Sequence, residues 1–405
     1  MYCNGICKDD FKLGETMKIF QINTVYNSGS TGRIAADIKH ALEAEGHECF
    51  VAFGRGNSTE KNTECVSNKL DLYGHVFLTR LTDKTGLYSK KATKRIIELI
   101  EGFEPDVIHL HNIHGYYLNY KMLFEFLAAY NKPIVWTLHD CWPYTGHCAY
   151  YDMAGCDKWK TGCHKCPALE LYPKAYMDSS KANYETKKAA FNLVEKMVFV
   201  TPSKWLGDEV KKSFLGKYPV RVINNGIDTD CFTYTEGDIR EKYNLGDKKI
   251  VLGIASVWDK RKGLDDFVEL ANYLNPDYQI VLVGVSEQQI KQLPASIKAI
   301  RRTESKVELA QLYSAAEVLF NPTYEDNYPT VNLESLACGT PVITYNTGGS
   351  PESAFVEPES CVEKKDYKEI CNRIYDAKKV EIDRTKINIS QMKSAYLDLY
   401  AEMKE

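Results

Sequence analysis

Short runs of apolar residues alternate with stretches of helical periodicity along almost the whole chain. A first series of runs predicts strands at 18–23, 49–53, 106–111, 134–139 and 197–202. A second series predicts strands at 220–224, 249–256, 279–285, 318–321 and 341–345. Nearly continuous hydrophobicity is typical of parallel strands that are buried on both faces, with helices as the crossover connections. The pattern therefore predicts an α/β fold with two doubly wound, Rossmann-like domains.

The two series are separated by a polar helical segment and Pro219. We place the domain boundary near Leu215, which gives a first domain at 17–215 and a second at 216–385. Residues 1–16 precede the first predicted strand and form an N-terminal extension. The last segment, 386–405, has the apolar spacing of a single amphipathic helix.

Polar side chains follow several of the predicted strands. Residues 29–33, with the sequence GSTGR, come after the first strand, His139 follows the strand at 134–138, and Asp326 follows the strand at 318–321. In open parallel sheets, ligands bind beyond the carboxyl ends of the strands. Two such domains in tandem therefore predict a cleft between them, at which these polar groups meet.

The segment between the last two predicted strands contains acids, a proline and an apolar helix. Pro329 suits the first turn of that helix. The free amides of Thr330 and Val331 would favour an anion at the helix start. Asp326 lies just before the helix and Glu334 lies within it, eight residues on. This layout predicts a phosphate held between two acids that bind polyols, as a sugar nucleotide requires. A capped helix with two solvated acids is the alternative.

Composition narrows the class of protein. A chain of 405 residues predicts two or three domains. Its net charge of -4 gives no sign of a nucleic-acid partner. We find no apolar run of the ~20 residues that span a bilayer, and residues 1–16 lack the apolar core of a signal peptide. An odd number of cysteines, thirteen, argues for a reducing compartment. We therefore expect a cytoplasmic protein.

Four of the cysteines fall in one loop-like insertion at 146–167: Cys148, Cys156, Cys163 and Cys166. The last two form a C-x2-C pair, and four thiols could close a tetrahedral zinc site, with a nearby histidine able to replace one of them. Such a zinc would be structural, because four protein ligands leave no open position. Buried free cysteines or a redox pair are the alternatives.

The basic sequence KKATKR at 90–95 opens a predicted helix whose other face is apolar. Polybasic amphipathic helices can contact anionic lipid. The alternative is a solvated basic face over the protein core.

Together these segments resemble glycosyltransferase family 4, nucleotide-sugar enzymes of the two-domain GT-B fold that retain anomeric configuration. The resemblance covers nearly the whole chain from Met17 and is closest to bacterial enzymes that build capsular and exopolysaccharide repeat units. It is carried, in this order along the chain, by PDVIHLH at 105–111, TLHD at 137–140, TPS at 201–203, INNGID at 223–228, KRKG at 260–263, the segment at 324–342 and GGSPE at 348–352.

The resemblance implies roles for several residues. Asp326 would contact hydroxyls of the transferred sugar and Glu334 the ribose diol, because the two donor-binding acids of the family have this spacing. Lys262 would neutralise the diphosphate, and Arg261 or Lys260 would compensate for an arginine that the family often has where Ser256 stands. His139 would lie at the mouth of the cleft and position the sugar. A solvated basic turn and a structural histidine are the alternatives for the last two sites.

Further donor contacts are implied at Gly29, Gly32 and Arg33 in the first domain, and at Tyr328, Thr330 and Val331 in the second. A simple tight turn is the alternative for the glycine segment. The chain also departs from the family pattern, which usually has Glu at the first acid position, followed by Phe-Gly where Tyr328 and Pro329 stand. Since Pro329 lacks an N–H, the set of phosphate-binding amides differs from that pattern.

The implied reaction moves a hexose-type unit from a nucleoside diphosphate to a glycan, with the departing phosphate taking the acceptor proton. The resemblance also implies a lipid-linked acceptor, contact with the inner face of the plasma membrane, no cofactor for the chemistry, and a C-terminal helix that packs back on the first domain. The alternatives are a GT-B sugar-nucleotide epimerase and a non-catalytic, zinc-stapled glycan-binding protein.

Overall fold

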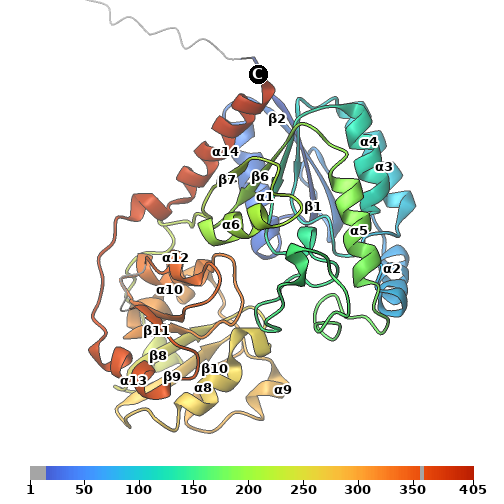
Figure 1. Cartoon of the computed structure of the whole chain (residues 1–405). Coiled ribbons are helices and arrows are strands. Elements are labelled where there is room, and N and C mark those ends of the chain that lie inside the picture. Colours follow the sequence, from blue (N-terminus) through green and yellow to red (C-terminus); the bar gives the residue numbers. More distant parts are fainter. Residues whose placement is uncertain (1–14, 356–359) are drawn as a thin grey trace, which may run out of the picture.

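The computed structural model describes residues 15–355 and 360–405, and Figure 1 shows them folded into two domains. The first domain is built on a seven-stranded sheet in the order β3-β2-β1-β4-β5-β6-β7. All of its pairings are parallel. Its strands are β1 (Lys18–Val25), β2 (Glu48–Arg55), β3 (Thr63–Cys65), β4 (Val107–Leu110), β5 (Ile134–Thr137), β6 (Met197–Thr201) and β7 (Val220–Val222).

The second domain is built on a six-stranded parallel sheet in the order β10-β9-β8-β11-β12-β13. Its strands are β8 (Lys249–Ile254), β9 (Tyr278–Val283), β10 (Ile297–Ile300), β11 (Val318–Asn321), β12 (Val342–Tyr345) and β13 (Cys361–Val362). Two parallel, doubly wound sheets confirm the predicted fold class.

Helices cover both faces of each sheet. In β1, Phe20 and Ile22 enter one apolar cluster and Ile19 enters another on the opposite face, which explains why the strand is continuously hydrophobic. The first domain has α1 (Gly29–Ala44), α2 (Lys69–Thr82), α3 (Lys90–Phe103), α4 (Tyr120–Tyr130), α5 (Ser180–Phe191) and α6 (Lys204–Lys212). The second has α7 (Ile239–Lys242), α8 (Leu264–Leu270), α9 (Glu287–Ile290), α10 (Lys306–Ala315), α11 (Thr330–Ala337), α12 (Ser350–Ser353) and α13 (Tyr367–Asp376), and α14 (Ile389–Lys404) ends the chain.

The first domain extends further along the chain than we predicted. The strand expected at 220–224 is β7, and it pairs with β6 in the first sheet, with Val220 opposite Phe199. Leu215, the predicted boundary, is fully buried in a core cluster of the first domain. The chain therefore leaves the first sheet after Val222. The predicted extension lies mostly outside the described residues.

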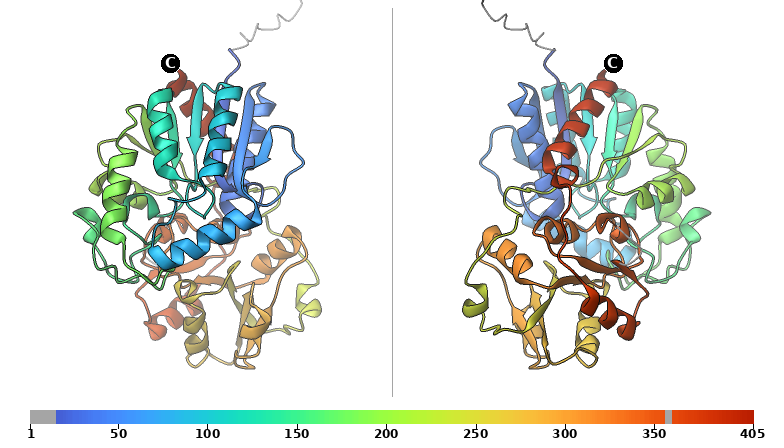
Figure 2. Two further views of the ribbon diagram at one scale, coloured as in Figure 1. Left: turned by 90° about the vertical axis from the view of Figure 1, so that its right-hand side faces the viewer. Right: turned by 90° about the vertical axis from the view of Figure 1, so that its left-hand side faces the viewer.

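Helix α14 returns to the first domain, as predicted. The hydroxyl of Tyr400 lies 2.6 Å from Nδ1 of His109, and the hydroxyl of Tyr396 lies 2.9 Å from Oγ1 of Thr137. His109 lies in β4 and Thr137 lies in β5, two central strands of the first sheet. Figure 1 and the right-hand view of Figure 2 show this helix, in red, lying along the first domain.

The two segments that connect the domains lie side by side. Ile227 donates its N–H to the carbonyl of Ile387 and accepts from the N–H of Ile389, both at 2.8 Å. A Cβ atom at Gly226 would lie 2.5 Å from Cα of Ile389, so only glycine fits at this crossing. The pairing joins the two crossing segments at one point.

Candidate functional site

The basic turn and the acid loop of the second domain meet at the carboxyl end of β11. Nζ of Lys262 lies 2.5 Å from Oδ2 of Asp326. The turn is a short 3-10 helix, and the side chain of Asp259 caps it by accepting from the N–H of Lys262 at 3.0 Å. Gly263 follows with a φ of +72°, and its missing Cβ would lie 2.4 Å from the carbonyl oxygen of Pro322. This close packing places the basic turn on the acid loop.

Two cations share the carboxylate of Asp326. Arg261 lies 4.0 Å from Oδ2 of Asp326 and donates to the carbonyl of Glu325 at 2.7 Å. Burial by itself would raise the pKa of Asp326, but the charges of Lys262 and Arg261 outweigh it and hold the pKa below its ordinary value. The group is therefore an ionised carboxylate between two cations, a cluster that a bound diphosphate could reorganise.

Helix α11 begins next to this cluster, and Pro329, which we predicted in its first turn, is the N-cap residue that precedes that turn. Gly348 and Gly349 pack against the acid loop, where added Cβ atoms would lie 2.3 Å from the carbonyl oxygen of Asp326 and 1.8 Å from that of Asn327. Thr330 and Val331 form the first turn and are half-buried. The structure therefore brings this helix start, the basic turn and Asp326 together.

Glu334, on the same helix, is half-buried beside Tyr313. Its Oε2 accepts from the hydroxyl of Tyr313 at 2.9 Å. Burial raises the pKa of Glu334 to about 7, while the charges of Arg33 and Lys306 act in the opposite direction. Arg33 belongs to α1 of the first domain and Lys306 to α10. The charge of Arg33 therefore acts on Glu334 across the junction between the domains.

The glycine segment opens α1. Gly29 adopts a φ of +63° and is exposed, whereas Gly32 is buried under the preceding loop, where a Cβ would lie 3.1 Å from Cγ2 of Val25. Arg33 is exposed. The segment thus forms a tight turn that also presents a cation toward the second domain.

His139 stands at the end of β5, half-buried. Its Nε2 lies 3.1 Å from Nδ1 of His111, and Nε2 of His111 lies 2.9 Å from Oε1 of Gln21. Burial lowers the pKa of His139 to about 4. The imidazole is therefore neutral near pH 7. A neutral imidazole can form hydrogen bonds to sugar hydroxyls, but it brings no positive charge to the site.

The domains touch directly at this site. The side chain of Asn327 donates to the backbone carbonyl of His139 at 2.5 Å, and Oε1 of Glu325 accepts from the N–H of Met153 at 2.7 Å. The guanidinium of Arg261 lies 5.0 Å from the ring centre of Tyr150. These contacts bridge the junction at which we predicted a cleft.

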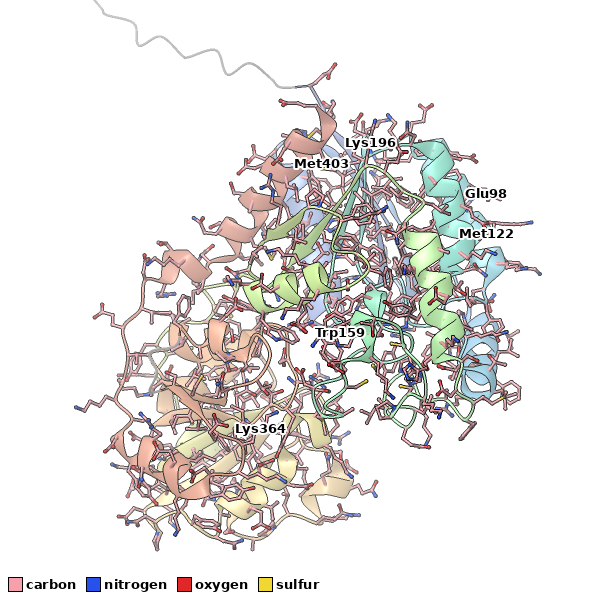
Figure 3. All side chains as sticks on the ribbon, viewed as in Figure 1. Glu98, Met122, Trp159, Lys196, Lys364 and Met403 are labelled. Atoms are coloured by element: carbon pink, nitrogen blue, oxygen red, sulfur yellow. The ribbon has the colours of Figure 1, made fainter. Side chains whose placement is uncertain are left out.

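Glu352 makes a further contact between the domains. Its two carboxylate oxygens accept from the backbone N–H groups of Lys204 and Trp205, each at 2.7 Å, at the start of α6 in the first domain. A carboxylate at a helix start is favourable because the free amides and the dipole both attract negative charge. Figure 3 shows the labelled Trp159 on the side of the first domain that faces the second domain, which carries Lys364.

Tyr328, a predicted donor-binding residue, is buried. It is 7% exposed and packs in an apolar cluster of the second domain. Its ring therefore packs under the acid loop. Its predicted donor contact stays a prediction, which only its place next to Asp326 supports.

Sequence reasoning missed part of the site in the first domain. Nε2 of His114 lies 2.7 Å from Oδ2 of Asp140, and Nδ1 of His114 lies 3.2 Å from the hydroxyl of Tyr172. The signal was available, since His114 follows β4 and Asp140 follows β5 at the same edge of the sheet. Glu325 was missed as well, although it directly precedes Asp326.

The cysteine-rich insertion packs beside this site. Cys148, Cys156, Cys163 and Cys166 line one small pocket together with His147 and His164. All four are free thiols, and Sγ of Cys163 accepts from the N–H of Gly146 at 3.1 Å. In the described parts of the chain, no group of three or more His, Cys, Asp or Glu side chains is arranged to hold a metal ion. The zinc site remains a prediction.

The fold and the site define a two-domain, GT-B type glycosyltransferase, and comparisons with known proteins agree. Residues 31–231 match the model of Glycosyltransferase Family 4, and residues 235–391 match that of Glycosyl transferases group 1. The chain belongs to glycosyltransferase family 4, and it is a transferase.

A curated relative supports the same assignment, and solved structures share the fold. The chain is 27% identical over 356 residues to the Escherichia coli protein WcaC, whose name assigns it to colanic acid biosynthesis, covering 83% of this chain and 85% of WcaC. The fold is similar to sucrose-phosphate synthase from Thermosynechococcus elongatus, with a TM-score of 0.68, 16% identity, and 96% and 99% of the two chains covered. Anabaena HepE in complex with UDP and glucose has a TM-score of 0.58 at 15% identity, covering 96% and 97%.

Proposed function

We propose that this glycosyltransferase moves a sugar from a nucleoside diphosphate to a hydroxyl of a glycan acceptor, with retention of anomeric configuration. The observation that carries the proposal is the cluster of Lys262, Arg261 and Asp326 at the start of α11, directly at the junction with the first domain. Two cations and a helix start form an anion site, which the leaving diphosphate requires. The solved complex of HepE with UDP-glucose has the same fold and supports this choice of donor.

Each side chain has a distinct task in the proposed reaction. Lys262 and Arg261 stabilise the charge that develops on the diphosphate as the sugar bond breaks, an effect that is larger in the transition state than before it. Glu334 holds the ribose, and neutral His139 orients the transferred sugar. The departing phosphate takes the proton of the attacking hydroxyl, so the chemistry requires no metal or organic cofactor.

We further propose that the acceptor is a lipid-linked repeat unit of an exopolysaccharide, which the similarity to WcaC supports. The enzyme would work in the cytoplasm, at the inner face of the plasma membrane. In the described part of the chain, none of the helices is long and apolar enough to cross a bilayer.

The test of the donor site is Lys262→Ala, with Lys260→Ala as the matched control. Lys260 is exposed and lies in the same turn. Loss of one positioned group that stabilises transition-state charge typically lowers kcat by ~100-fold to 1,000-fold. We therefore expect kcat/KM for sugar transfer to fall by about that factor in Lys262→Ala and to stay close to wild type in Lys260→Ala.

Equal activity in the two variants would contradict the assignment of Lys262. A panel of sugar nucleotides, screened first by thermal shift, identifies the donor, because a ligand that binds only the folded state raises the Tm. Product analysis then separates the alternatives. An epimerase alters the donor with no acceptor present, and a binding protein shows a thermal shift but no product.

A further inference from the structure

Helix α2 turns its apolar face outward. Leu70, Tyr73 and Phe77 are 86%, 67% and 61% exposed, and Leu81 continues the same stripe one turn later. A helix on the surface of a globular domain normally buries such a stripe against the core. In the left-hand view of Figure 2, α2, in light blue, lies across the front of the first domain with no other element over it.

Polar contacts fix α2 in this orientation. The buried ring of His75 lies 2.8 Å from Oγ of Ser89 through Nδ1, and its Nε2 accepts from the N–H of Gly86 at 3.1 Å. Asp83, which caps the helix, binds the imidazole of His147 in the insertion. Rotating α2 to bury the apolar stripe would break these buried hydrogen bonds. The polar groups that form them would then be left without partners, which costs free energy. The outward stripe is therefore a stable feature of the domain.

A neighbouring loop extends the apolar surface. Tyr176 donates its N–H to the carbonyl of Arg80 at 2.7 Å, which holds the loop against α2. Leu171, Tyr176 and Met177 of this loop are all exposed. We call α2 and residues 171–177 together the apolar platform.

Basic side chains surround the platform. Lys69, Arg80 and Lys84 are exposed in or beside it and form no ion pair within the described residues, whereas Lys174 is paired with Glu170 at 2.6 Å. The other nearby acids are Asp71, which accepts from Ser67, and Asp178, which accepts from the backbone N–H groups of Cys166 and Ser180. An apolar stripe with tyrosines and a basic margin matches the interface of an anionic bilayer, in which apolar side chains enter the acyl boundary and cations meet phosphate headgroups.

A second copy of the chain fits the platform less well. A symmetric contact would place the same patch against itself and bring its basic margin face to face with an identical one. The basic start of α3, for which the sequence left a lipid contact and a solvated basic face open, is also less suited. Its apolar side chains Ile96 and Ile100 are buried, and Arg95 is paired with Glu64 at 2.8 Å.

The platform leads directly to the acceptor side of the site. Tyr172, in the platform loop, contacts His114 at 3.2 Å, and His114 contacts Asp140 at 2.7 Å. Asp140 directly follows His139. The platform therefore adjoins the end of the first sheet at which His139 lies, the place where the proposed function requires the acceptor.

We propose that the apolar platform is a membrane-contact surface that seats the enzyme on an anionic bilayer beside its acceptor. The inference deepens the proposed function, because it rests on a lipid-linked acceptor, and it assigns the contact to α2 and residues 171–177.

Co-sedimentation with lipid vesicles tests this surface without any sugar nucleotide. We expect the wild-type chain to bind phosphatidylcholine vesicles that contain phosphatidylglycerol, and to bind less as salt rises. The double variant Leu70→Glu/Phe77→Glu should bind at least ~10-fold more weakly, because a buried Leu or Phe side chain contributes that factor or more. Tyr234→Glu is the control, since Tyr234 is 60% exposed in the second domain; its binding should match wild type.

Several results would overturn the proposal. These are the absence of vesicle binding by the wild type, equal binding by the double variant, and a wild-type dimer in sedimentation velocity that the double variant converts to monomer. Transfer to a short-chain acceptor in detergent separates this inference from the proposed function. Sugar transfer without vesicle binding would contradict only the membrane-contact proposal. Vesicle binding without sugar transfer would contradict only the proposed function.

Discussion

Glu334 is the residue at which burial and function conflict most clearly. It was predicted as a ribose ligand from its spacing to Asp326, and the structure adds what spacing could not show, that its carboxyl group is buried beside Tyr313. Sequence reveals which residue types share a helix end, but desolvation depends on everything packed around them. For this reason its pKa could not be predicted from the sequence.

The raised pKa of Glu334 predicts a pH effect on stability. A carboxyl that titrates near 4.5 when unfolded and at about 7 when folded binds its proton more tightly in the folded state. Its contribution is fully present below about pH 4.5 and is lost as the pH rises through 7. We expect the variant Glu334→Gln, which is always neutral, to lack this loss of roughly 3 kcal/mol.

Thermal unfolding at pH 5 and pH 8 measures the effect. The Tm of wild type, measured relative to the Tm of Glu334→Gln, should be lower at pH 8 than at pH 5. The variant Glu236→Gln, which removes an exposed acid of the same domain, should track wild type at both. A constant difference between wild type and Glu334→Gln across this range would mean that the group does not titrate there.

Elements with continuous apolar runs were predictable, and short edge strands were not. The strand at 318–321 was predicted with the bounds that β11 has, because a central strand is buried on both faces. No apolar run predicted β3, β10 or β13, each of which is a short strand at the edge of its sheet. Helix α2 escaped prediction as a surface element for another reason, since apolar periodicity says which residues share a face but not whether that face points inward.

The cysteine-rich insertion carries the element-scale prediction. If Cys148, Cys156, Cys163 and Cys166 hold a structural zinc, the purified protein should contain about one zinc ion per chain by mass spectrometry, as a four-ligand site requires. Cys163→Ser should lose the metal and lower the Tm. Cys231→Ser, a half-buried cysteine of the second domain, is the control. Metal-free wild-type protein with four titratable thiols would show that these cysteines are a packed thiol cluster.

At the scale of the whole molecule, the domains are joined by contacts whose partners lie far apart in sequence. Glu325 meets Met153 and Glu352 meets the start of α6. The two-domain architecture could be predicted from the order of strands. These contacts could not, because they depend on the angle between the domains, and no local pattern encodes that angle.

The contacts of Glu352 are expected to help hold the two domains together. Its carboxylate accepts two charge-assisted hydrogen bonds, each of a kind that contributes roughly 1.5–3 kcal/mol. Glu352→Gln should therefore open the junction and increase the radius of gyration measured by small-angle X-ray scattering. Glu363→Gln, at an exposed position of the same domain, should not. An unchanged radius in Glu352→Gln would show that the other bridges suffice.

The return of α14 has a consequence for biosynthesis. A ribosome makes chains from the N-terminus, and domains generally fold as they emerge. Here the hydroxyls that meet His109 and Thr137 come from Tyr400 and Tyr396, 291 and 259 residues later in the chain. The first domain of the nascent polypeptide therefore has one flank of its sheet uncovered until α14 has been synthesised. Premature termination shortly before residue 389 would thus damage the domain that was synthesised first.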